Sequence, residues 1–96
     1  MSSYLTIPEI TESEPLQSVQ MEHDNKSFVA VLAADSVAVR LNLAAQNGEQ
    51  IPLVVLTMDN AIVALDNVYV AGITFSAGGQ EPLAEVTFQA EAVRFV

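Results

Sequence analysis

The sequence predicts a single, mainly β domain, and three observations lead to this prediction. The chain has 96 residues, about the length of one domain. Residues that favour strands (Val, Ile, Thr, Phe and Tyr) account for 29 of them. Apolar and polar residues also alternate along several segments, which is typical of strands with one buried face. We therefore expect one domain of antiparallel strands over residues 1–96.

The first strand is expected at residues 4–7, where the alternation is clear, and Pro8 marks its end or a sheet edge. The polar residues 11–15 predict a loop, and 16–21 a short strand. The segment 22–27 contains His-Asp-Asn-Lys and predicts a turn.

Two central strands, 28–34 and 51–58, are apolar on both faces. Strands with two dry faces lie in the middle of layered structures. In so short a chain, the second dry face is expected to meet another subunit. Along 51–58, one face carries Leu53 and Val55, and the other carries Val54, Leu56 and Met58. The candidate interface residues are Phe28, Leu32, Leu53, Val54, Val55, Leu56 and Met58.

The segment 35–48 has two interpretations. Asp35 or Ser36 could cap a helix that ends at Gly48. The alternation of larger apolar residues along 37–43 instead favours a strand, and the Asn-Gly pair at 47–48 then predicts a turn. Both interpretations remain open on pattern alone.

The last third of the chain is patterned more clearly. Asp-Asn pairs at 59–60 and 66–67 each predict a turn before a strand, and a further strand is expected at 68–76. Gly78 and Gly79 predict a turn with positive φ. Along 86–92, the apolar residues stand at even-numbered positions and face one side of the strand. At Val93 and Phe95 the apolar residues stand at odd-numbered positions instead, so they face the other side. This flip predicts a bulge or a second buried face near Ala92.

Charge excludes several classes of function. Twelve acidic and three basic residues give a net charge of −9, and Lys26, Arg40 and Arg94 are isolated in the sequence. Nucleic-acid binding needs clustered basic residues, so we expect none, and anionic membrane surfaces are disfavoured for the same reason. The apolar runs are too short to insert in a bilayer. No Lys or Arg precedes Lys26, whereas a signal peptide begins with basic residues. We therefore expect no signal peptide and a cytoplasmic location.

No residue pattern calls for catalysis, a metal or a cofactor. His23, between Glu22 and Asp24, could act as a metal ligand or general base. The chain has no second His and no Cys to complete such a site, so a solvated turn is favoured. The four glycines form no phosphate loop. We therefore expect a protein that is not an enzyme.

The apolar content is high for this length. Hydrophobic residues make up 51% of the chain, and the mean hydropathy is +0.37. A domain of this size hides only about 60–65% of its surface. The excess indicates a surface kept for a partner or for other copies of the chain.

Several stretches resemble the haemolysin-coregulated protein (Hcp) family, the tube proteins of type VI secretion systems, whose fold phage tail tubes share. The residues that carry the resemblance are 65–70 (LDNVYV), 73–79 (ITFSAGG), Pro82, 85–88 (EVTF) and 93–95 (VRF), with weaker likeness at 4–8 (YLTIP) and 41–45 (LNLAA) to Ile51.

The resemblance implies a small β-barrel of two packed sheets, with a short helix around 36–46. It also implies a hexameric ring that stacks into the conduit of a contractile injection machine. Partners would be other copies of the chain and sheath, spike or cargo proteins, and the protein would be exported with, or attached to, its particle. The chain departs from the family in its length and in the short loop at 22–27, a region that family members use in stacking. The alternative is a small acidic β-sandwich that binds a partner protein as an adaptor.

Overall fold

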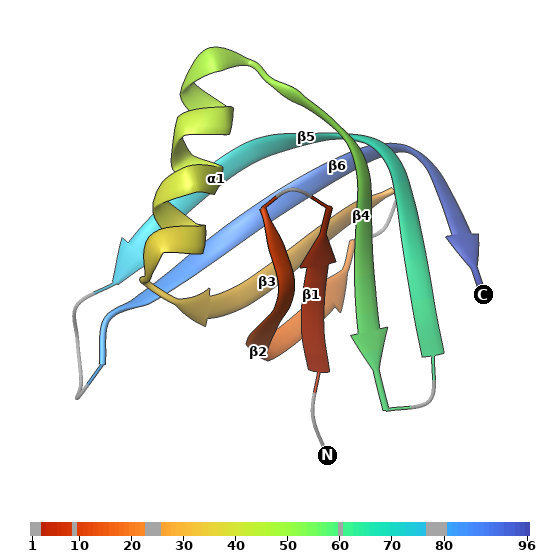
Figure 1. The fold of residues 1–96 in the computed structure, drawn as a ribbon, viewed down its shortest axis with the longest axis horizontal. Helices are drawn as coiled ribbons and strands as arrows, with labels where there is room; N and C mark the ends of the chain where they lie inside the picture. The colour runs from red at the N-terminus through yellow and green to blue at the C-terminus, as the bar shows by residue number, and fades with distance from the viewer. Residues whose placement is uncertain (1–2, 9, 23–25, 60, 77–80) are drawn as a thin grey trace.

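A computed structural model describes residues 3–8, 10–22, 26–59, 61–76 and 81–96. These residues form a closed antiparallel barrel of six strands with one helix (Figure 1). The strand order around the barrel is β1-β2-β3-β6-β5-β4, and β4 pairs with β1 to close it. This confirms the mainly β barrel with one helix. The elements are β1 (Ser3–Ile7), β2 (Thr11–Met21), β3 (Ser27–Ala33), α1 (Ser36–Asn47), β4 (Gln50–Met58), β5 (Ala61–Ser76) and β6 (Leu83–Phe95).

The core fills the barrel with apolar side chains from every strand. Every second residue is buried on β3 and on β6 as far as Ala90, and Phe28 lies directly opposite Phe88 across the two strands. On β1 and β4, Leu5 lies opposite Leu56, and both are fully buried. The largest fully buried side chains are Phe28, Phe88, Leu5, Ile7, Leu32, Leu41, Leu56 and Leu65.

The segment after β3 is a helix, as the family resemblance implies, and not a strand. The Asp35 side chain caps α1 by accepting hydrogen bonds from the backbone N–H groups of Val37 and Ala38. The buried positions are Ala38, Leu41 and Ala44, which are three residues apart and share one helical face. Two of these three residues are small. Of the larger apolar side chains that suggested a strand, Leu41 lies on the packing face, whereas Val39 and Leu43 are exposed.

Gly48 ends α1 in the left-handed region, with φ 62° and ψ 31°. An added Cβ would meet no atom within 4 Å, so a substitution there acts through backbone strain alone. We expect Gly48→Ala to lower the unfolding free energy by about 1 kcal/mol, seen as a melting temperature lower by roughly 4–8 °C. Gly72→Ala is the matched control, because that site is equally open and has no positive φ. Equal melting temperatures for the two variants would contradict this account.

The predicted loop at 11–15 is wrong, because β2 begins at Thr11. Glu14 and Pro15 lie opposite Leu5 and Tyr4 of β1. The polar content of this stretch suggests a loop, but pairing with β1 holds it extended. Most of its polar side chains face solvent, and Glu14 is the exception.

The predicted turn at the second Asp-Asn pair is also wrong. Asp66 and Asn67 lie within the continuous strand β5, where Asn67 has a φ of 54°. Arg94 on β6 donates two hydrogen bonds to the Asp66 carboxylate, at 2.7 and 2.9 Å. Asn67 Nδ2 donates to Glu91 Oε2 at 3.3 Å. Bonds across to β6 thus take the place of the local turn bonds that this pair usually makes.

The alternation of buried and exposed residues changes phase near the same point. Leu65 and Val68 are three residues apart, yet both belong to the same hydrophobic core, and Asn67 with its positive φ lies between them. On β6, Val93 lies opposite Leu65 and packs against the core, whereas Ala92 is exposed. The pairing of β6 with β5 keeps its register around Ala92, so the predicted bulge does not lie there. The register shift that marks a bulge lies further along, beside Gly72.

Some predictions fall on residues outside the described ranges: the roles of His23 and of the turn at Gly78 and Gly79. At the ends of the predicted turn at 22–27, the Glu22 N–H donates to the Ser27 carbonyl at 2.8 Å. In the ranges that the structure describes, no helix has the length and apolar character needed to cross a membrane.

Candidate functional site

The structure divides the predicted interface residues into two groups. Phe28, Leu32, Val54 and Leu56 are at most 1% exposed and belong to the hydrophobic core. Their side chains point into the barrel, because alternate residues of a strand face the same side. The expectation that these four side chains present a free apolar face is therefore corrected: they hold the subunit together.

The other predicted residues, Leu53, Val55 and Met58, are half-buried. Leu53 and Val55 lie on the outer face of β4, opposite in parity to Val54. This face is therefore the part of β4 that another subunit could reach.

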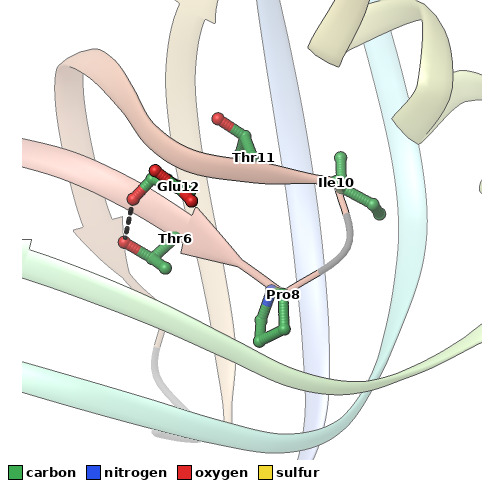
Figure 2. A pocket seen from close by; sticks show the side chains of 5 residues that line it. All are labelled: Thr6, Pro8, Ile10, Thr11 and Glu12. Atoms are coloured by element: carbon green, nitrogen blue, oxygen red, sulfur yellow. Dashed lines mark hydrogen bonds between the residues drawn. The ribbon is translucent and has the colours of Figure 1, made fainter.

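A groove lies where the turn between β1 and β2 approaches the start of β4. Two neighbouring hollows share Pro8, Ile51 and Pro52, and Leu53 lines one of them and Ile10 the other. We call these five residues the turn groove. Figure 2 shows the adjoining hollow, which Pro8 and Ile10 also line, and in which Thr6 Oγ1 donates to the Glu12 carbonyl at 2.8 Å. The part of the groove beside Leu53 is mainly apolar, whereas the part beside the Arg40–Glu49 ion pair is more polar.

A second apolar surface lies at the other end of β4. Met58, Ile62 and Val96 line one hollow, and we call these three residues the end patch. The Val96 N–H donates to the Ile62 carbonyl at 2.9 Å, which fixes the carboxyl terminus beside β5. Ile62 is 41% and Val96 80% exposed. The sequence analysis selected Met58 but not Ile62 or Val96, because Val96 is far from the other two in the sequence and meets them only in the fold.

Two strand segments have a ladder partner on only one side among the described residues. On β5, pairing with β4 stops at Tyr69, while pairing with β6 continues to Ser76. On β6, pairing with β3 stops at Gln89, while pairing with β5 continues to Phe95. Among the described residues, 71–76 and 91–95 thus form two open edges on different strands.

The helix and β5 also expose apolar side chains that the sequence analysis did not select. Val39 and Leu43 are 56% and 48% exposed, and they lie one turn apart on the outer face of α1. Tyr69 and Phe75 are similarly exposed on β5. A helical-wheel plot of 36–47 separates Val39 and Leu43 from the buried face. The helix interpretation could therefore have identified these two residues as exposed.

The charged groups are mostly acidic, and both arginines are held in ion pairs. Arg40 donates to both oxygens of Glu49, at 2.7 and 3.1 Å, and Arg94 does the same to Asp66. The hydrogen bonds from Arg94 lower the pKa of Asp66, and those from Arg40 lower the pKa of Glu49. Within the described ranges, no group of three or more His, Cys, Asp or Glu side chains could hold a metal ion.

Neither a scan of protein-family models nor a search of curated proteins finds a match. Solved structures do match over nearly the whole chain. Hcp2 from Salmonella typhimurium superposes with a TM-score of 0.87 at 14% identity, over 99% of this chain and 85% of that one. A type VI secretion system effector from Yersinia pestis gives 0.80 at 11% identity, over 98% and 96%. The secreted protein Hcp3 from Pseudomonas aeruginosa gives 0.75 at 14% identity, over 99% and 89%. The chain therefore has an Hcp-like fold, and most of each neighbour has a counterpart in it.

Proposed function

We propose that this chain is the structural ring and tube subunit of a type VI secretion-like or related contractile injection apparatus. The observation that carries the proposal is the Hcp-like barrel, which spans nearly the whole chain. The neighbours that share this fold include proteins described as Hcp2, as a type six secretion system protein and as the secreted protein Hcp3. On this proposal the protein is structural and has no catalytic role.

The unpaired surfaces suit head-to-tail assembly. A closed ring repeats one interface in which a surface of each subunit meets a different surface of the next. The two open edges at 71–76 and 91–95 lie on different strands, as such an interface requires. The turn groove and the end patch are separated along β4 by about 20 Å at strand spacing. The two surfaces of each pair are thus separate on the subunit. One subunit can contact one neighbour through the first surface and the other neighbour through the second.

Of the predicted interface residues, Leu53 and Val55 remain candidates, since their side chains lie outside the barrel. Met58 shares the inward parity of Val54 and Leu56 and packs partly against the core, and it reaches the surface only in the hollow beside Ile62 and Val96. We propose a hexamer, stacked into a tube that sheath, spike or cargo proteins contact, and export of the subunit by its own machine. The alternative, a small acidic adaptor that binds a partner protein as a monomer, would use the same exposed apolar side chains.

Mass in solution separates the two functions. We expect light scattering after size exclusion to give about six times the chain mass of 10.3 kDa, and negative-stain images to show rings. Leu43→Ser on the outer face of α1 is a control for unspecific apolar association, and it should leave the mass unchanged. A stable 10.3 kDa monomer at micromolar concentration would contradict the ring and favour the adaptor.

A further inference from the structure

Glu14 is the one buried ionisable side chain in the described part of the chain. It lies on β2 opposite Leu5 and is 7% exposed. Its Oε1 atom has no hydrogen-bond partner among the described residues. Ionised carboxylates are rarely buried without a cation or several donors, so this position needs a reason.

The partner of Glu14 is a second carboxyl group. The Glu14 side chain is hydrogen-bonded to the side chain of Asp35, the residue that caps α1. Two carboxyl groups can share a hydrogen bond only when one of them carries a proton. Asp35 Oδ1 already accepts from Val37 N at 3.0 Å and Ala38 N at 3.3 Å, and the helix dipole favours a negative charge there. The shared proton therefore lies on Glu14, which donates to Asp35.

The surroundings of Glu14 favour its neutral form. β1 presents the apolar Leu5, and on β2 the nearby Glu12 is exposed. The charged group that acts on Glu14 is Asp35, while Arg40, further along α1, is engaged with Glu49. Burial first, and then the bond to Asp35 and its charge, raise the pKa of Glu14 from 4.5 to about 7. The hydrogen bond from Glu14 in turn lowers the pKa of Asp35.

We propose that Glu14 and Asp35 form a proton-operated latch between β2 and the first turn of α1. With its proton, Glu14 donates to Asp35 and ties the helix cap to the barrel. Once Glu14 loses the proton, its buried carboxylate faces the exposed carboxylate of Asp35, and the two charges repel. The first turn of α1, with the buried Ala38, then separates from the barrel more readily. This inference does not depend on the proposed ring.

The direction of the pH effect follows from the raised pKa. Between pH 4.5 and about 7, folded Glu14 keeps a proton that the unfolded chain has released. The contribution of the latch is therefore complete below pH 4.5 and is lost as the pH rises through about 7. The lowered pKa of Asp35 acts oppositely, and its contribution is lost only at acid pH, below its ordinary value of 3.8.

Carboxyl ¹³C NMR and amide exchange on the wild-type protein test the latch directly. We expect the Glu14 carboxyl resonance to titrate near pH 7. Protection factors of the Val37 and Ala38 amides, corrected for intrinsic exchange, should fall at least tenfold between pH 5 and pH 8, since one pKa unit is a factor of about ten. A Glu14 midpoint near 4.5 would overturn the proposal, whether or not any variant folds.

Glu14→Gln supplies the matched variant, because its amide can still donate to Asp35 but has no proton to lose. We expect its protection factors at Val37 and Ala38 to stay constant over the same pH range. Glu12→Gln removes an exposed carboxylate from the same strand and should keep the wild-type pH dependence. If the protection factors of Glu14→Gln also fall with pH as in the wild type, the latch proposal is contradicted.

Discussion

Leu56→Asp is expected to unfold the domain, whereas Leu53→Asp is expected to leave it folded. Leu56 is fully buried and lies opposite Leu5 of β1 and Val63 of β5, so an aspartate there would be an unpaired buried charge. Such a charge costs several kcal/mol, comparable with the roughly 5–15 kcal/mol total stability of a small domain. Leu53, three residues away, points outward, and an aspartate there can be hydrated.

Circular dichroism and size exclusion on the two variants measure this difference. Loss of strand signal for Leu56→Asp with a native spectrum for Leu53→Asp is the expected pair of results. If the outer face of β4 contributes to a ring, Leu53→Asp should also give a smaller assembly than the wild type. Two unfolded variants would mean that both faces of β4 are core, and two native spectra would contradict the burial of Leu56.

Phe28→Ala is expected to lower the unfolding free energy by about 3–5 kcal/mol, the range for removing a buried aromatic ring. Phe28 is 1% exposed and lies directly opposite Phe88 in the barrel. Its loss would leave a cavity between β3 and β6 that the closed barrel cannot collapse to fill. Urea unfolding followed by circular dichroism gives the free energy.

Phe75→Ala is the matched control, because Phe75 is 48% exposed on β5 and its replacement leaves no internal cavity. We expect it to change the unfolding free energy by less than about 1 kcal/mol. This comparison also separates the two roles considered for Phe28. A contact residue would affect assembly and leave the subunit stable, so a small loss of stability with dissociation would contradict the core assignment.

The strands with a regular period were predictable from the sequence. In β4, the period of two separates Leu53 and Val55 from Val54 and Leu56 without any structure, because successive strand residues point to opposite faces. The same parity holds for the buried residues of β6 up to Ala90. What parity does not say is which face is inside. That depends on where β1 and β5 lie beside β4, which is a property of the whole barrel.

For the helix, the local sequence indicates where it begins and ends, but only the tertiary structure decides that it forms. Both caps, Asp35 and Gly48, are visible in the sequence, yet the alternation of Val and Leu at 37–43 competes with them. Packing decides the outcome, since α1 buries a face that includes the small Ala38 and Ala44 and leaves Val39 exposed. A scale based on side-chain hydrophobicity gives little weight to alanines, although small side chains allow close approach to the barrel.

By itself, the sequence determined a mainly β domain, its acidic character, the two faces of β4 and the caps of a helix. Only the tertiary structure decided that the polar start of β2 is a strand, that Asp66 and Asn67 continue one, and that Glu14 is buried against Asp35. The physical reason is common to all three. A polar residue favours a loop only while its hydrogen bonds are local, and here the partners come from distant strands or from the cap of α1.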